Sequence, residues 1–253
     1  MNQSPPETGN VYPQNPVHVQ MPERKPIITM ILIGLSVIFF ILQNLVQLLT
    51  GADLLFLFGG KINEFIMAGQ VWRLFTPVLL HGSIMHIAFN MYALFILGRR
   101  LERFYGHGRF FLLYILSAFA GNVLSFVLTP APSLGASTAI FGLLAAEGMF
   151  IFQNRTLFGP NQTRQAMLNL AIILMINLSL GFSPGTNIDN MGHIGGLIGG
   201  LFFAAKAGPL LQFTGQPPLL NLVDTRKQGD VTLASLVVTI GFSVIALIPY
   251  LTM

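Results

Sequence analysis

Residues 190–205 read NMGHIGGLIGGLFFAA, a stretch that carries no charged side chain. A hydrocarbon core roughly 30 Å thick takes about 20 mostly apolar residues in helical form, so the stretch predicts a membrane-spanning helix. Its two Gly-Gly pairs leave the backbone free for close contact with another helix. His193 lies within it, and ionisable side chains inside a membrane are costly and usually functional. The stretch therefore predicts a tightly packed helix with a functional histidine.

The rest of the chain has the same composition. Of its 253 residues, 53% are hydrophobic and 9% are charged, whereas a soluble domain carries about 25% charged residues. Further long apolar stretches occur, each bounded by charged, Gly-rich or Pro-rich sequence. The predicted spans are 27–49, 82–98, 110–128, 137–152, 166–181, 190–205 and 231–251. The chain is therefore predicted to be an all-α membrane protein.

The spans divide the chain into four regions. Residues 1–26 are polar and rich in proline, so they are predicted to be a flexible cytoplasmic tail. Residues 27–208 hold six spans and form the core, 209–230 are a cytoplasmic linker, and 231–253 form a seventh transmembrane helix. The chain contains no cysteine, which removes disulfides and thiolate metal sites from consideration.

Basic residues indicate the orientation. If seven helices alternate in direction, only Lys61 and Arg73 fall on one side of the membrane. The other side then holds Arg24, Lys25, Arg99, Arg100, Arg103, Arg109, Arg155, Arg164, Lys206, Arg226 and Lys227. Since Lys and Arg near helix ends are retained in the cytoplasm, the N-terminus is predicted to be cytoplasmic. Anionic lipid headgroups then account for the net charge of +4, and no nucleic acid partner is needed.

The segment between the first two spans is too apolar for a solvated loop and too interrupted for a span. It contains LLFLFGG at 54–60 and the pair Trp72-Arg73. Tryptophan is enriched where lipid meets water. We expect an interfacial hairpin with Trp72 at headgroup depth.

Polar side chains gather near the outer ends of the second, fourth and sixth spans. His81 precedes the second span, and His86 and Asn90 are four residues apart, so they share a helix face. Ser137 begins the fourth span and His193 lies in the first turns of the sixth. Because these three spans run in the same direction, all five side chains are predicted to lie at similar depth.

These residues are the parts of a site for acyl transfer. A serine hydroxyl becomes a good nucleophile when a base takes its proton, and His193 is a suitable base for Ser137. The free backbone N–H groups at the start of the fourth span, with His86 and Asn90, could stabilise an oxyanion. Phe141 lies on the Ser137 face of its helix and is expected to stack on His193. Asp189 and Asn190 are weaker candidates for orienting that ring.

Other interpretations of single residues stay open. Ser137 on its own is better explained as a small packing residue. Metal binding by His81, His86 and His193 is disfavoured, since the five-residue step between the first two turns the helix by about 140° and no carboxylate accompanies them. Glu147 lies about 15 Å deeper than Ser137. It is expected to pair with a polar group near the cytoplasmic end.

Taken together, these motifs resemble the rhomboid family. The resemblance implies an intramembrane serine endopeptidase with a Ser-His dyad, a six-helix core with one additional C-terminal transmembrane helix, and neither metal nor cofactor. Its partners would be transmembrane protein substrates, cleaved within or beside the membrane, and the lipid bilayer. The protein would lie in a bacterial plasma membrane with its site opening to the extracytoplasmic side. The implied residues are Ser137 and His193 as the dyad, His86, Asn90 and the Ser137 backbone for the oxyanion, and His81, Gly135, Phe141, Trp72 and Arg73 in support.

Two positions depart from the usual pattern. Thr138 stands where many members have Gly, and Phe141 stands where some have Tyr. We expect the β-branched Thr138 to narrow the space beside the nucleophile and so to affect substrate preference. A catalytically inactive relative that binds membrane segments remains an alternative, although such relatives typically lose the serine or the histidine. A transporter would predict paired half-repeats, and the sequence shows no convincing repeat.

Overall fold

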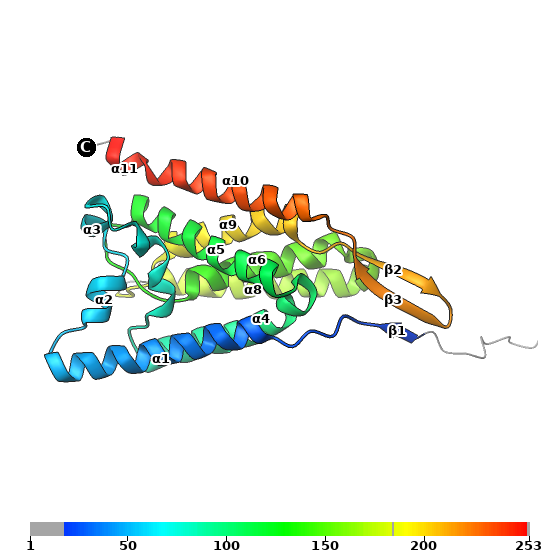
Figure 1. The fold of residues 1–253 in the computed structure, drawn as a ribbon, viewed down its shortest axis with the longest axis horizontal. Coiled ribbons are helices and arrows are strands. Elements are labelled where there is room, and N and C mark those ends of the chain that lie inside the picture. The colour runs from blue at the N-terminus through cyan, green and yellow to red at the C-terminus, as the bar shows by residue number, and fades with distance from the viewer. Residues whose placement is uncertain (1–17, 184, 252–253) are drawn as a thin grey trace, which may run out of the picture.

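The computed structural model describes residues 18–183 and 185–251. Long helices make up most of this part of the chain (Figure 1). They are α1 (Ile27–Thr50), α4 (Ile84–Tyr105), α5 (His107–Leu128), α6 (Ser137–Gln153), α8 (Pro160–Gly181), α9 (Asn190–Ala207) and α10 (Gln228–Ala246). Each corresponds to one predicted span.

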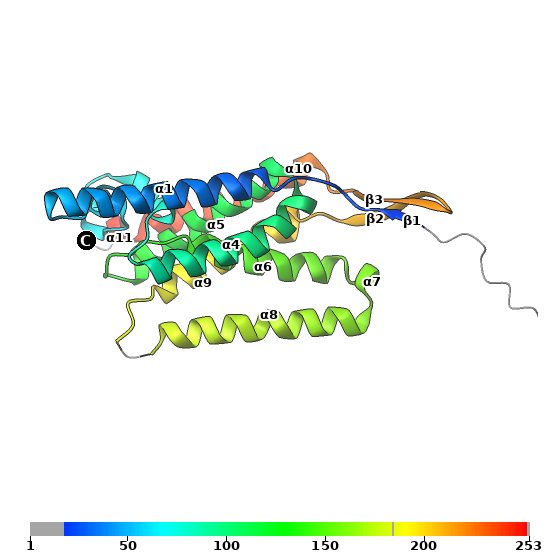
Figure 2. The same ribbon diagram turned by 90° about the horizontal axis from the view of Figure 1, so that it is seen from below.

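Helices α5, α6 and α9 form the centre of the molecule. Most side chains of α5 and α6 are buried, and α9 presents its glycines to both. The other long helices lie around this centre, with α10 along one side and α1 and α4 along another (Figure 1). Helix α8 is the outermost and has no buried residue (Figure 2). The three central helices therefore place the start of α6 beside the start of α9.

Four helices in the described ranges are long and apolar enough to cross a membrane. They are Ile27–Thr50, His107–Leu128, Pro160–Gly181 and Gln228–Leu251. Ser137–Gln153 is a shorter apolar helix. Length and composition thus support a membrane protein that is mostly helical, as predicted.

Side chains fix where several helices begin. Ser83 and Asp189 precede α4 and α9 and accept hydrogen bonds from the backbone N–H groups of His86 and Gly192. Such caps satisfy amides that have no partner inside the helix. The start of α1 is capped from another helix, because the carboxylate of Glu102 accepts the N–H groups of Ile28 and Thr29 at 2.8 Å each. This contact anchors α1 to α4.

The segment between α1 and α4 folds into short helical turns. They are α2 (Leu54–Gly59), α3 (Asn63–Met67), η1 (Val71–Leu74) and η2 (Thr76–Leu79). The segment predicted to form an interfacial hairpin thus consists of compact helical turns. Gly59-Gly60 and Gly69 interrupt the helical runs, and Pro77 lies in the first turn of the last one.

A small sheet departs from the all-α expectation. Strands β2 (Leu211–Gln216) and β3 (Leu219–Asp224) form an antiparallel hairpin, and β1 (His18–Gln20) pairs in parallel with β3. The sheet extends beyond the helical bundle (Figure 1). It occupies part of the expected linker 209–230 and the last part of the expected tail 1–26. Leu211 and Phe213 alternate with Gln212 and Thr214, a strand pattern, and the two residues 217–218 connect the strands. Residues 1–17 of that tail lie outside the described part of the chain.

Several helix boundaries also differ from those predicted, three of them most clearly. Helix α4 continues through Gly98 and ends at Tyr105. Gly98 does not end the helix; it allows close contact between α4 and Thr29 of α1. Helix α8 begins at Pro160, ahead of the expected 166, since proline suits the first turn of a helix. The seventh segment ends as α10 followed by α11 (Ile248–Leu251). Thr252 and Met253, expected to end it, lie outside the described residues.

Candidate functional site

Ser137 is the first residue of α6. Gly135, two residues before it, has φ +128°, a conformation that residues with a side chain rarely adopt. Its N–H donates to the carbonyl oxygen of Pro77 at 2.9 Å. A methyl group at Gly135 would lie 2.7 Å from His86 Nε2 and 3.7 Å from Ser137 Oγ. Glycine is therefore needed both for the turn into α6 and for the space between His86 and Ser137.

The segment that enters α6 is held by the loop between α1 and α4. Lys61 pairs with Ser133 through both backbone groups, at 2.9 and 3.0 Å. The Lys61 side chain, fully buried, donates to the carbonyl oxygens of Thr129 and Ala131 at 2.7 and 2.8 Å. Asn63 donates to the Thr129 oxygen as well. Lys61 was not expected to contribute, and its only signal in the sequence is its isolation from the other basic residues.

His193 lies one turn into α9, and its Nε2 is 2.9 Å from Ser137 Oγ. Close contact between α6 and α9 makes this distance possible. A side chain at Gly196 would collide with the Thr138 carbonyl oxygen, and one at Gly200 would collide with the backbone of Gly142. The glycine face predicted for this helix therefore lets the two backbones touch.

Phe141 stacks on the His193 ring. The ring centroids are 4.1 Å apart and the planes differ by 10°, so the stacking predicted from the sequence is present. The other side-chain nitrogen, His193 Nδ1, has no hydrogen-bond partner in the described part of the chain. The imidazole is thus supported by a ring on its face, whereas a Ser-His-Asp triad supports it with a carboxylate hydrogen-bonded to Nδ1.

The two other candidates for orienting His193 have different contacts. Asp189 caps α9 and accepts hydrogen bonds from Ser125 and, more weakly, from Thr129. Asn190 donates to the carbonyl oxygen of Leu178 at 3.1 Å, which joins the start of α9 to the end of α8. Both residues fix the helix that carries His193, and neither touches its ring nitrogens.

His86, Asn90 and His81 approach the site from α4 and the loop before it. Nδ1 of His86 accepts a long hydrogen bond of 3.4 Å from the Gly82 N–H, which favours the tautomer with hydrogen on Nε2. That nitrogen faces the space over Gly135. Asn90 Nδ2 donates to the His86 carbonyl oxygen at 3.0 Å and keeps a second N–H. The His81 ring is buried and meets His86 edge-on, with centroids 5.2 Å apart.

Trp72 and Arg73 lie in η1 and stabilise the loop rather than the reacting groups. The Arg73 guanidinium is buried and donates to the carbonyl oxygens of Gly60 and Leu57 and to Gln70 Oε1, at 2.7, 2.5 and 2.8 Å. It also lies over the Phe65 ring. Trp72 donates to the Phe58 oxygen at 3.1 Å, and its side chain is largely exposed. Neither residue contacts Ser137 or His193 in these interactions.

Thr138 does not lie where it was expected. Its side chain packs between α5 and α9, so that a methyl group at Gly121 would lie 2.6 Å from its Cβ and one at Gly192 would lie 3.1 Å from its Cγ2. The turn of α6 points Thr138 into the helix interface, away from the space over Gly135. The expectation that it narrows the space beside the nucleophile is corrected accordingly. Gly121 and Gly192, which the sequence did not single out, make room for it.

Glu147 is paired at the other end of the bundle, as expected. Its Oε1 lies 2.8 Å from Arg100 Nη1. In the described residues no group of three or more His, Cys, Asp and Glu side chains is arranged to hold a metal ion. The histidines near the start of α6 are His81, His86 and His193, and the charged residues Lys61 and Asp189 lie in the segments that support it.

Comparison with known proteins supports the resemblance. The rhomboid domain family matches residues 68–209. Rhomboid protease GluP of Bacillus subtilis (strain 168) is 45% identical over 184 residues, which cover 73% of this chain and 35% of that protein. RHOMBOID-like protein 9, chloroplastic, of Arabidopsis thaliana is 36% identical over 62% of this chain and 36% of its own length. Rhomboid-like protease 1 of Toxoplasma gondii is 37% identical over 63% of this chain and 55% of its own length.

The matched region spans about a third to just over half of these relatives' own length. It includes the loop with Trp72 and Arg73, the start of α4, and the starts of α6 and α9. The family match covers more than half of the 253 residues, and with the site geometry it leads to one assignment: this chain belongs to the rhomboid family.

Proposed function

We propose that the protein is an intramembrane serine endopeptidase in which Ser137 is the nucleophile and His193 the general base. The observation that carries this proposal is the distance of 2.9 Å between Ser137 Oγ and His193 Nε2. A nucleophile and its base need to lie within hydrogen-bond reach. The stacked Phe141 ring keeps the imidazole facing the serine.

The reaction follows from the two side chains. With hydrogen on Nδ1, the Nε2 of His193 accepts the Ser137 hydroxyl proton while Oγ attacks the substrate carbonyl carbon. The resulting imidazolium returns the proton to the leaving amine as the peptide C–N bond breaks. Water then loses a proton to Nε2, attacks the acyl-enzyme ester and releases the acid, and the proton returns to Oγ.

In this proposal three groups stabilise the oxyanion. The backbone N–H of Ser137 opens α6 and has no acceptor within the helix, and the positive end of the helix dipole lies there. Nε2 of His86 borders the same space above Gly135. The second N–H of Asn90 is the third donor in this proposal. Removal of one such donor typically costs about 10²–10³ in kcat.

The membrane arrangement is part of the proposal. All seven long helices would cross the bilayer, six in the core 27–208 and the last after the segment 209–230. The distribution of basic residues supports a cytoplasmic location for the N-terminus and the ends of α4 and α6, and with it a site at Ser137 that opens to the extracytoplasmic side of a plasma membrane. Substrates would be transmembrane proteins that offer an unwound segment at this end. The chemistry calls for no metal, cofactor or nucleic acid.

Activity can be tested with purified protein reconstituted with a panel of single-span substrates, with fragments mapped by mass spectrometry. Wild type should cleave, and Ser137→Ala and His193→Ala should lose at least about 10³-fold in rate. Ser235→Ala and His18→Ala serve as matched controls, because Ser235 lies on α10 and His18 lies in β1. Both controls should cleave at the wild-type rate.

A serine-reactive fluorophosphonate probe provides a second measurement. It should label wild type and fail to label Ser137→Ala. Absence of both labelling and cleavage in folded wild type would support a catalytically inactive rhomboid relative that binds membrane segments.

The absence of native cysteine permits a direct test of orientation. Ser183→Cys, near the start of α9, should react with an impermeant maleimide on intact cells. Thr156→Cys, in α7 (Arg155–Phe158), should react only after the membrane is opened. The reverse pattern would overturn the proposed orientation.

A further inference from the structure

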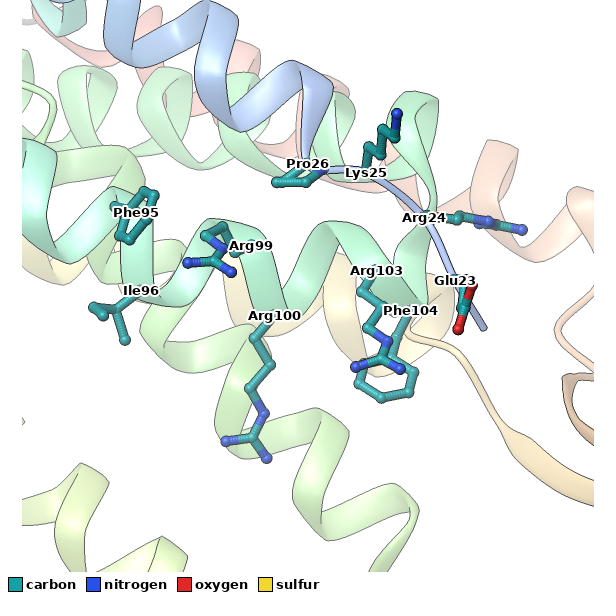
Figure 3. A pocket seen from close by; sticks show the side chains of 10 residues that line it. All are labelled: Glu23, Arg24, Lys25, Pro26, Phe95, Ile96, Arg99, Arg100, Arg103 and Phe104. Carbon is teal, nitrogen blue, oxygen red and sulfur yellow. The ribbon is translucent and has the colours of Figure 1, made fainter. Parts of the chain in front are cut away.

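A pocket of about 760 Å³ lies between the segment that leads into α1 and one face of α4. The N-terminal segment contributes Glu23 to Pro26, and the last turns of α4 contribute the opposite wall (Figure 3). Ser137 faces the start of α4, so this pocket lies at the other end of that helix. The pocket plays no part in the proposed hydrolysis.

The pocket walls are strongly basic. Five cationic side chains and one acidic side chain line it: Arg24, Lys25, Arg99, Arg100, Arg103 and Glu23. Arg100 is engaged with Glu147. Arg99 and Arg103 are four residues apart on α4, and in the described part of the chain neither forms an ion pair. Like charges at this spacing destabilise a helix, so the arrangement favours an anion between them.

The two unpaired guanidinium groups are held in place. Arg99 lies over the Phe95 ring at 4.6 Å, and Arg103 lies over the Phe104 ring at 5.9 Å. Nε of Arg103 also donates to the Pro22 carbonyl oxygen at 2.7 Å, which fixes the N-terminal segment over the pocket. The remaining N–H groups of Arg99 and Arg103 can donate paired hydrogen bonds to phosphate oxygens.

An apolar surface continues from the basic pocket. A second cavity of about 390 Å³ shares Lys25 and Pro26 with it and is lined by Ile27, Met30 and Ile31 of α1. These three α1 side chains are each 49% exposed. A free phosphate would fill only the basic part, whereas a ligand with both a phosphate and an acyl chain would cover both parts.

We propose that this pocket binds the headgroup phosphate of an anionic phospholipid, with an acyl chain against Ile27, Met30 and Ile31. Anionic lipid is favoured over zwitterionic lipid because a headgroup ammonium would face the arginines. The site lies at the depth where juxtamembrane basic side chains meet lipid headgroups. Under the proposed orientation it faces the cytoplasmic leaflet. Lipid binding joins the N-terminal segment, α1 and α4 at one point.

Binding can be measured by native mass spectrometry of delipidated full-length protein titrated with phosphatidylglycerol or with phosphatidylcholine of the same acyl chains. Wild type should retain phosphatidylglycerol in preference to phosphatidylcholine. The pair Arg99→Gln and Arg103→Gln should weaken phosphatidylglycerol binding about 30-fold, which corresponds to about 1 kcal/mol for each arginine removed. The thermal midpoint in phosphatidylcholine verifies that each variant is folded.

The matched control is the pair Arg155→Gln and Arg164→Gln, which removes the same charge at the same end of the molecule but outside the pocket. It should change phosphatidylglycerol binding less than about threefold, since distant exposed charges are screened. Should the double pocket variant not fold, Arg99→Gln alone provides the test, because the Arg99 guanidinium makes no hydrogen bond within the described residues. It should weaken binding about fivefold.

Three outcomes would overturn the proposal. Equal losses in the pocket and control pairs would show attraction to the whole basic end. Equal retention of the two lipids would show that the pocket does not distinguish an anionic headgroup from a zwitterionic one. Displacement of the lipid by millimolar inorganic phosphate would show a soluble-anion site. None of these readouts depends on proteolysis, so the proposal and the proposed protease activity fail separately.

Discussion

The side chain of Thr138 fills the space beside Gly121, where an added methyl group would lie 2.6 Å from both the Thr138 Cβ and the Gly192 carbonyl oxygen. Three helices meet at this point, and two of them carry Ser137 and His193. Gly121→Ala should therefore push α5 away from α6 and α9. We expect a loss of about 1–3 kcal/mol in stability, typical of overpacking, together with slower cleavage.

The measurements are the thermal midpoint in detergent and the cleavage rate. Gly241→Ala on α10 is the matched control, because a methyl group there meets nothing within 4 Å. Replacing an open helical glycine with alanine stabilises by about 0.5–1 kcal/mol. Equal thermal midpoints and cleavage rates for the two variants would show that the close packing at Gly121 is not needed for the site.

The hydroxyl of Thr138 gives a related prediction. Its Oγ1 is buried and has no hydrogen-bond partner in the described structure. Thr138→Val keeps the shape and removes a buried polar group that costs about 1–3 kcal/mol. Stability should rise or stay equal, and cleavage should continue. Loss of cleavage at unchanged stability would instead assign the hydroxyl a part in the reaction.

Phe141 should affect catalysis through the position of His193. Phe141→Leu removes the stacked ring, which contributes about 0.5–1.5 kcal/mol, and should lower kcat about 2- to 12-fold with little change in KM. Phe141→Tyr keeps the ring and should retain most of the rate. Phe152→Leu is the control on the same helix, since Phe152 is exposed and remote from His193. A change in KM alone would indicate that Phe141 contacts substrate instead.

Arg73 should matter for stability more than for chemistry. The Arg73 guanidinium donates to three acceptors at once, and a lysine ammonium in its place would reach only some of them. The guanidinium also lies over the Phe65 ring, a contact that lysine would weaken. We expect Arg73→Lys to cost roughly 2–4 kcal/mol, because buried acceptors are left without donors. Arg164→Lys on α8 is the exposed control. Near-equal thermal midpoints for the two variants would contradict a structural role for Arg73.

Much of the site was predictable because it follows from two simple regularities, the alternating direction of successive helices and the period of the α-helix. The starts of the second, fourth and sixth helices lie at one end whenever helices alternate, which predicts Ser137 near His193. The period of α6 places Phe141 on the face of Ser137, and the stacking follows. The basic residues at the far end likewise predict that Glu147 finds a partner there, which is Arg100.

The features that were not predictable depend on distant contacts. Strand β1 pairs with residues 219–221, and no local pattern in the polar tail reveals that pairing. The direction of Thr138 is set by glycines on α5 and α9, which have no side chain to mark a partner in the sequence. Lys61 reaches carbonyl oxygens nearly 70 residues away.

The pH dependence of stability tests the environment of Lys61, which lies in the loop outside the spans. Burial lowers its pKa from 10.5 to about 8, and the nearby charges of Asp189 and Glu64 oppose this shift. Between these two values the unfolded chain holds a proton that the folded protein has released. The contribution of Lys61 to the free energy of unfolding should therefore rise with pH across this window and should not change with pH below it.

The comparison is with Lys61→Met, in which this titration is absent. The thermal midpoint of wild type minus that of the variant should stay constant from pH 6 to about 8 and then increase up to about pH 10.5. Contributions from other titrating groups cancel in the difference. A constant difference over the whole range would show that the buried ammonium keeps its ordinary pKa, held there by the Thr129 and Ala131 oxygens. A difference that falls with pH would mean that the charged form is stabilised by folding, so that the carbonyl contacts outweigh the cost of burial.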